Sequence, residues 1–218
     1  MIFKNREEAA RLLAARLAAY RGKHPLVLAI PRGAAPMAKI LAGELGGEVD
    51  VVLVRKLRAP YQPELAIGSV DEEGHVYLGE AFHALGIDDD YVEMEKKLQL
   101  ESLHRRRAFY TPVHPPISPA GRTVIVLDDG IATGASMTAA LRSVRAKKPA
   151  RLIAAAAVAP EGSLKQIEGL ADEVVCLQTP SDFYAVGQFF ENFEQVSDEE
   201  VIAILSQAEI GRGDSIGR

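Results

Sequence analysis

The chain has 218 residues, 48% of them hydrophobic, which is enough for one large α/β domain with a substantial core. Its net charge of -5 provides no general basic field for nucleic acid, and a single cysteine, Cys176, excludes an internal disulfide and a cysteine-rich zinc site. No signal peptide is visible, and the longest apolar stretch, 152–160, is too short to cross a membrane. These features predict a soluble cytoplasmic protein without a membrane partner and argue against a nucleic-acid partner.

The first part of the chain alternates between helix and strand. Asn5 can cap an initial helix, and residues 26–30 form a short apolar strand that runs into P-R-G-A at 31–34. A helix over 36–45 follows. A strand, a glycine-containing turn and a helix start together offer an anion site, because the first N–H groups of a helix are unpaired. The alternative is that P-R-G-A is a plain turn with a surface arginine.

The next segment changes from strand and helix to hairpin. Residues 49–54 predict a strand that ends in Arg55 and Lys56, and we expect these cations at the same sheet edge as P-R-G-A. Short alternating runs on either side of D-E-E-G, within 57–79, predict an antiparallel hairpin. A short helix over 81–85 and a long one over 88–109 follow. The long helix begins with acids and ends with His104 to Arg107, which suits the helix dipole; an RNA contact is the alternative explanation.

The most informative stretch is T-V-I-V-L-D-D-G-I-A-T-G-A-S-M, residues 123–137. Val124 to Leu127 predict a strand buried on both faces, followed by the adjacent carboxylates Asp128 and Asp129 on an exposed loop. A small-residue loop over 130–136 then leads into a helix. Backbone N–H groups at the helix start can hold a phosphate while the carboxylates accept hydroxyl hydrogen bonds, so the stretch predicts a sugar-phosphate site. An ordinary turn with a solvated acidic pair is the alternative.

The remaining elements continue the alternation of strand and helix. A strand over 151–158, a helix over 161–170 and a last core strand over 173–177 predict a mainly parallel sheet with right-handed crossovers. Ligands of such sheets bind at the carboxyl ends of the strands, where the P-R-G-A and D-D loops emerge. A terminal helix over 197–208 follows, and residues 211–218 show no apolar pattern and should be disordered.

Residues 124–136, V-I-V-L-D-D-G-I-A-T-G-A-S, resemble the phosphoribosyl pyrophosphate (PRPP) binding motif of type I phosphoribosyltransferases. A Walker A loop does not fit, because no lysine follows the glycines, and the dinucleotide fingerprint G-x-G-x-x-G is absent. The resemblance implies an α/β fold with a mainly parallel sheet flanked by helices on both faces, a small hood from terminal segments and a β-hairpin insertion. It implies one domain over 1–210, with a mobile catalytic loop at 57–79 and a base-side flap at 179–197, in a homo-oligomer, most simply a dimer.

The same resemblance implies roles for site residues. Asp128 and Asp129 would act as catalytic residues that hold the ribose hydroxyls, directly or through Mg²⁺. The 5-phosphate would lie on the loop Ala132, Thr133, Gly134, Ala135 and Ser136. Pyrophosphate would face Arg32, Gly33, Arg55 and Lys56.

The residues expected on the base side of the site resemble two different branches of the family. The tail T-P-S-D-F-Y-A-V-G-Q-F-F-E-N-F resembles the hypoxanthine-guanine branch, which implies that Tyr184, with Ala185, contacts the base and that Glu191 joins the metal site. A purely hydrophobic flap is the alternative. The hypoxanthine-guanine enzymes carry an Asp where this chain has Ala132, and adenine-type enzymes have Ala there. Glu64 is then the candidate general base, on the hairpin.

The resulting functional prediction is Mg²⁺-dependent transfer of ribose 5-phosphate from PRPP to a nitrogenous base, with release of pyrophosphate, as in purine salvage. Two alternatives stay open: a PRPP- or nucleotide-sensing regulator on the same fold, and a PRPP or nucleotide phosphohydrolase. The acceptor base is not assigned.

Overall fold

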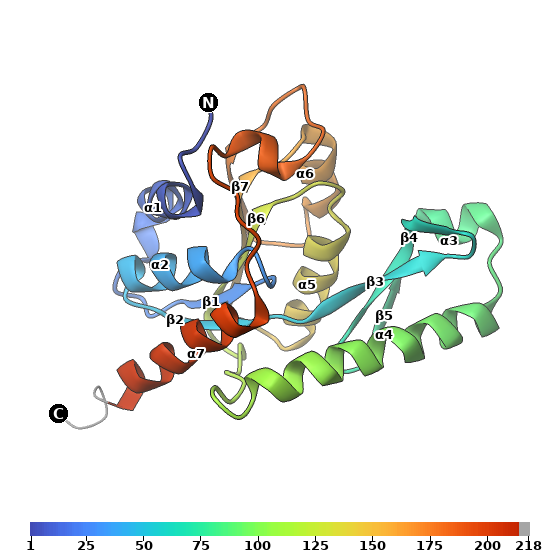
Figure 1. Ribbon diagram of the computed structural model, residues 1–218, viewed down its shortest axis with the longest axis horizontal. Coiled ribbons are helices and arrows are strands. Elements are labelled where there is room, and N and C mark those ends of the chain that lie inside the picture. Colours follow the sequence, from blue (N-terminus) through green and yellow to red (C-terminus); the bar gives the residue numbers. More distant parts are fainter. Residues whose placement is uncertain (214–218) are drawn as a thin grey trace.

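Five parallel strands form the central sheet of the computed structural model, in the order β2-β1-β6-β7-β8 (Figure 1). The structure describes residues 1–213, apart from the side chains of Glu64, Glu80 and residues 209–213. The strands are β1 (Leu26–Ala29), β2 (Glu48–Val51), β6 (Thr123–Gly130), β7 (Arg151–Val158) and β8 (Glu173–Gln178). All four pairings in this sheet are parallel, which confirms the predicted sheet.

Helices cover both faces of this sheet. Alternate residues of a strand point to opposite faces, so Val27 packs in the core cluster that includes α1 (Arg6–Arg16) and α2 (Ala35–Leu45). Its neighbour Leu28 belongs to a second cluster with α5 (Ala135–Ala146) and α6 (Glu161–Ile167). The β6 strand is buried on both sides, as its continuous apolar run predicts.

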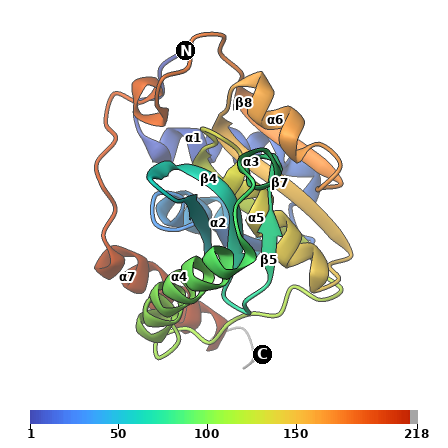
Figure 2. The ribbon, with the colours of Figure 1, turned by 90° about the vertical axis from the view of Figure 1, so that its right-hand side faces the viewer.

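A second, antiparallel sheet projects from this body as an arm, residues 54–110 (Figures 1 and 2). It contains β3 (Val54–Ala59), β4 (Gln62–Asp71) and β5 (Val76–Leu78), with α3 (Glu80–Leu85) and the long α4 (Asp89–Tyr110). The β4–β5 pairing closes around D-E-E-G, so the predicted hairpin is confirmed. Gln99, Ser102 and Arg106 recur at about one turn of α4, which places them on one side of the helix.

The position of Arg55 and Lys56 corrects the sequence-based expectation. They do not extend a strand of the central sheet, since β2 ends at Val51 and a separate strand, β3, begins at Val54. Both cations lie inside β3, paired with Val70 and Ser69 of β4. The apolar run 51–54 crosses this break and conceals it, because a strand that leaves one sheet for another carries the same residue types as an unbroken strand.

The start of the chain packs against the segment 179–197, here called the flap. The flap, residues 179–197, contains the short 3-10 helix η2 (Val186–Phe189), and Phe3 forms an isolated bridge with Phe190. Another 3-10 turn, η1 (Ala18–Tyr20), follows α1. The terminal helix α7 (Asp198–Gly213) runs beyond its predicted end, so residues 211–213 are helical rather than irregular. Residues 214–218 of the predicted tail lie outside the described residues. Within residues 1–213, the helices are too short or too polar to span a membrane.

Candidate active site

The acidic pair lies at the end of β6, inside the strand rather than on an exposed loop. Asp129 is only 9% exposed, and its backbone N–H donates to Asp128 Oδ1 at 2.9 Å. Burial, followed by the adjacent charge of Asp129, raises the pKa of Asp128 well above its usual range. Burial also raises the pKa of Asp129, and the cation beside it opposes that shift. Two carboxylates are therefore held in a place that favours a neighbouring positive charge.

Arg6 of α1 supplies a positive charge at the acidic pair. Its Nε donates to Asp129 Oδ2 at 2.9 Å, and its Nη2 lies 2.9 Å from the same oxygen. The guanidinium carbon is 3.8 Å from the centre of the Phe193 ring, and Nη1 donates to the Glu194 carbonyl at 2.7 Å. Arg6 thus connects the acidic pair with the flap, through one ion pair and one cation–π contact.

The P-R-G-A turn packs directly against the acidic pair. A methyl group added at Gly33 would overlap the Asp129 carboxylate, so only glycine allows this close approach. The peptide bond between Pro31 and Arg32 is cis. Arg32 does not point freely into solvent, because its Nη1 lies 3.4 Å from Asp198 Oδ2 at the start of α7. The P-R-G-A turn and the acidic pair therefore meet at one edge of the sheet.

The small-residue loop turns into α5 beside this pair. Gly134 has φ of 78°, a left-handed conformation that favours glycine, and it occupies the N-cap position. No side chain in the described structure caps this helix, so its first N–H groups face the loop without a protein acceptor from a side chain. Ala132 and Thr133 are exposed, and Ala135 and Ser136 are half-buried. Such a helix start is suited to a phosphate.

Lys56 of β3 lies beside the loop 132–136, which is the predicted phosphate-binding loop. It lines a cavity of about 490 Å³ that also contains Thr133 and Ala135, between α5 and the β4–β5 hairpin. It also lines a neighbouring cavity of about 410 Å³, together with Arg55, Ser136 and Pro31. Within β3, the two cations therefore still lie beside the predicted loops. They reach that place from the arm instead of from the edge of the central sheet.

The flap residues differ in how closely they approach the acidic pair. Tyr184 is 90% exposed, and Gln188 Oε1 accepts from the backbone N–H groups of Tyr184 and Ala185, at 2.9 and 3.1 Å. Val186 is closer to the site: its side chain fills the space where a side chain at Gly130 would lie. Together with Arg6, Gly33 and Asp129, Val186 lines a third cavity, of about 480 Å³. The aromatic residues of the flap pack mainly on one another, at ring distances of 5.5 Å for Phe183–Phe189 and 4.9 Å for Phe190–Phe193.

Two predicted residues are not assembled with the acidic pair. Glu191 is exposed, and its backbone N–H donates to the Phe3 carbonyl at 2.8 Å. Among the described residues, the one group of three acid or imidazole side chains close enough to share a metal is Asp71, Glu73 and His75 on the arm, so Glu191 does not complete such a group with Asp128 and Asp129. The backbone of residue 64 belongs to β4, and its side chain lies outside the described residues.

Sequence reasoning missed Arg6, Val186 and Phe193 as site residues. Arg6 left one signal: it lies in the first turn of α1, where the helix dipole disfavours a cation, so an external acidic partner would explain it. Nothing in the sequence identifies Val186 and Phe193 as site residues, because apolar residues of the flap have the same sequence pattern whether or not they face a site.

The residues at the end of β6 fit Mg²⁺. The two adjacent carboxylates provide the oxygen ligands that this ion prefers, and desolvation and the charge of Asp129 raise the pKa of Asp128. The Asp129 carboxylate already attracts a guanidinium in this structure. A divalent cation bound to Asp128 and Asp129 would offset the repulsion between the two carboxylates.

Comparison with known proteins agrees with this geometry. Residues 1–193 match the phosphoribosyl transferase domain family. Two Mycobacterium tuberculosis proteins, each named "Putative phosphoribosyl transferase" (MT0597 of strain CDC 1551 / Oshkosh and Rv0571c of strain H37Rv), are 40% identical over 208 residues, which is 95% of this chain and 47% of theirs. The chain thus spans about half the length of these relatives. The crystal structure of TT1426 from Thermus thermophilus is 42% identical, with a TM-score of 0.85 over 95% of this chain and 99% of that one. The chain belongs to the phosphoribosyl transferase domain family.

Proposed function

We propose that the protein transfers ribose 5-phosphate from PRPP to a nitrogenous base and releases pyrophosphate. The observation that carries this proposal is the packing of the P-R-G-A turn on the acidic pair, where Gly33 leaves no room for a side chain against Asp129. This contact brings an anion-binding turn, two carboxylates and the start of α5 to one edge of the sheet, and PRPP has a matching set of pyrophosphate, ribose hydroxyls and phosphate.

Each part of the donor then has its own residues. The 5-phosphate lies on the loop 132–136, where it accepts from the N–H groups at the start of α5. Asp128 and Asp129 would hold the ribose hydroxyls and Mg²⁺, and a bound Mg²⁺ would supply positive charge that stabilises the leaving pyrophosphate. Arg32, Gly33, Arg55 and Lys56 face the pyrophosphate. These contacts orient the ribose before the reaction.

In the transfer step, the bond between ribose C1 and the pyrophosphate oxygen breaks, and a ring nitrogen of the base forms the new bond to C1. The bonding electrons leave with pyrophosphate, and the ring nitrogen loses its proton. Ala132 has no group to accept this proton, so we assign that role to Glu64 of β4. The arm and the flap reduce the access of water, since the activated ribose would otherwise react with it. Tyr184 and Ala185 would contact the base from the flap, and Glu191 would be a further candidate ligand for Mg²⁺.

The test is a screen of purine and pyrimidine bases with PRPP and Mg²⁺, in which released pyrophosphate and the nucleotide product are both measured. One base should give a nucleotide and pyrophosphate in equal amounts. The variant Asp128→Asn/Asp129→Asn should lose this activity and the binding of Mg²⁺-PRPP in calorimetry. Pyrophosphate release without a base would indicate a phosphohydrolase. PRPP binding with no product from any base would contradict transfer and favour a regulator.

A further inference from the structure

The cavity of about 410 Å³ between body and arm is lined by four cationic side chains. Arg55, Lys56, Arg58 and Arg106 all line it, and no acidic residue is among its described lining residues. Only two of these cations, Arg55 and Lys56, belong to the predicted motifs. Arg106 comes from α4, about fifty residues further along the chain.

Such a cluster is unfavourable without a negative partner. Burial, and then the nearby charge of Arg106, lowers the pKa of Arg55, so the cations repel each other across the cavity. Arg55 Nε is buried without a hydrogen-bond partner, while its Nη2 donates to Ser102 Oγ of α4 at 3.0 Å. A buried donor without an acceptor costs free energy, which an anion in the cavity would recover.

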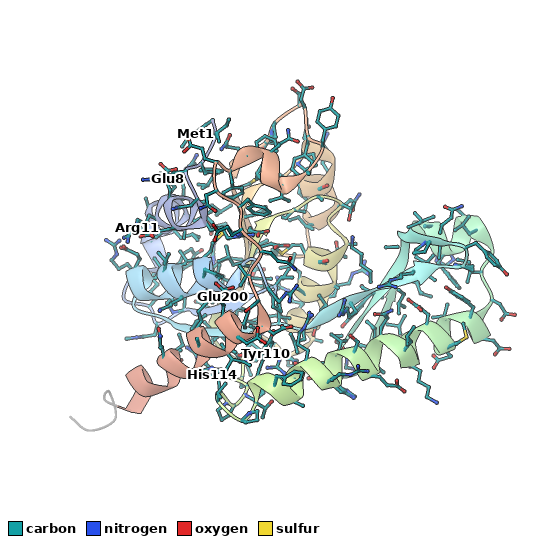
Figure 3. The ribbon with its side chains drawn as sticks, viewed as in Figure 1. Met1, Glu8, Arg11, Tyr110, His114 and Glu200 are labelled. Atoms are coloured by element: carbon teal, nitrogen blue, oxygen red, sulfur yellow. The ribbon has the colours of Figure 1, made fainter. Side chains whose placement is uncertain are left out.

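Arg106 is held at this cavity by an acid outside it. Its Nε lies 3.5 Å from Asp198 Oδ1, the residue that also lies 3.4 Å from Arg32 Nη1. Asp198 is in turn fixed by the Tyr110 hydroxyl, which donates to Oδ1 at 2.6 Å. Tyr110 lies where the end of α4 approaches the start of α7 (Figure 3). One carboxylate therefore orients a guanidinium from the P-R-G-A turn and one from α4.

We propose that Arg106 is an anion-binding residue that contacts the diphosphate of the donor, with Asp198 as its positioning residue. This inference rests on the proposed function for the identity of the ligand, and its chemistry is that of any diphosphate. The planar guanidinium can donate two parallel hydrogen bonds to phosphate oxygens, and its retained contact with Asp198 fixes the direction of the side chain. The helix α4 is then part of the binding site as well as the support of the arm.

The test is calorimetric titration with inorganic pyrophosphate, with and without Mg²⁺, of the full chain and two neighbouring variants. Arg106→Gln should weaken binding at least about tenfold, the loss expected for a hydrogen bond to a charged group. Arg105→Gln is the matched control, because Arg105 is exposed, lies outside the cavity lining and carries the same charge on the same helix. Its affinity should equal that of the unmodified protein.

Two further readouts separate direct binding from a structural effect. Pyrophosphate affinity should fall less steeply with ionic strength in Arg106→Gln than in the unmodified protein, because one charge fewer faces the ligand. Arg106→Lys should retain an intermediate affinity, since the charge remains and the planar fork is lost. If Arg106→Gln does not fold, Arg106→Lys decides the question alone.

The inference is overturned if the unmodified protein does not bind pyrophosphate, if Arg106→Gln and Arg106→Lys bind it as tightly as the unmodified protein, or if Arg105→Gln weakens it equally. These results are distinguishable from a failure of the proposed function. Transfer to a base with unchanged affinity in the Arg106 variants would reject the role of Arg106 alone. Arg106-dependent pyrophosphate binding in a protein that accepts no base would support this inference and reject the transfer.

Discussion

At the scale of single residues, Gly33 is a position in the site where an added side chain would overlap a neighbour. Gly33 brings the turn after β1 against the Asp129 carboxylate. Gly43, in the exposed part of α2, has no atom within 4 Å of the place where a Cβ would lie. The two glycines are therefore a natural pair for comparison, since one is required by a contact and the other is not.

For Gly33→Ala we expect a loss of about 1–3 kcal/mol of stability from overpacking, together with weaker binding of Mg²⁺-PRPP, because the methyl group must displace the Asp129 carboxylate. Urea unfolding and calorimetry measure the two effects. The control Gly43→Ala should instead gain about 0.5–1 kcal/mol, the difference in helix propensity, with unchanged PRPP binding. If Gly33→Ala is as stable as the unmodified protein and binds Mg²⁺-PRPP equally well, the close contact between residue 33 and Asp129 does not require glycine.

At the scale of elements, β8 is one of the two edge strands of the central sheet and is half-buried along its whole length. It carries Cys176, whose thiol donates to the Gln178 carbonyl at 3.1 Å. Burial raises the pKa of this thiol. Because Cys176 is the single cysteine of the chain, its reactivity reports on this strand alone.

We predict that a disulfide reagent at pH 8 modifies Cys176 at least about tenfold more slowly in the folded protein than in urea, because the raised pKa and burial both reduce the accessible thiolate. The folded pKa lies above the unfolded one, so this thiol contributes stability below the ordinary thiol pKa of about 8.5, and the contribution is lost as pH rises through the folded value. Cys176→Ala should lack that part of the alkaline loss. Equal reaction rates in the two states would contradict the burial of β8.

At the scale of the whole molecule, Arg6 connects the start of the chain with β6 and with the flap. It pairs with Asp129 of β6 and lies on the Phe193 ring of the flap, and Phe3 bridges to Phe190 close by. Figure 1 shows the N-terminus beside the flap. The cation that balances the acidic pair is thus also a link between segments distant in sequence.

The effect of removing Arg6 on stability should depend on whether Mg²⁺ is present. Arg6→Gln leaves the largely buried Asp129 carboxylate without its cation, for which we expect a loss of about 3 kcal/mol. If the acidic pair binds Mg²⁺, added Mg²⁺ should raise the Tm of Arg6→Gln more than that of the unmodified protein. Arg11→Gln, an exposed position on the same helix, should show neither effect. An identical Mg²⁺ response in all three proteins would count against a metal at Asp128 and Asp129.

Much of the fold could be predicted because it is encoded locally. The apolar run 124–127 predicted a doubly buried strand, and D-E-E-G predicted a hairpin. Asn5 predicted a helix cap, and its Oδ1 accepts from the Glu8 N–H at 3.0 Å. The break before β3 could not be predicted, since the apolar residues 51–54 fit one strand as well as a departure from the sheet.

The parallel sheet and the helix that starts after the glycine loop could be predicted from the residues alone, because runs of apolar residues and turn residues are read locally along the chain, whereas the acidic pair was expected on an exposed loop and lies inside β6. The partners of these features became visible only in the folded molecule: Arg6 on Asp129, Gly33 against the same carboxylate, and Arg106 at the cavity that Arg55 and Lys56 line. A charge or a close contact acts over a few ångströms in space, whereas the residues that meet there are separated by dozens of positions in the chain.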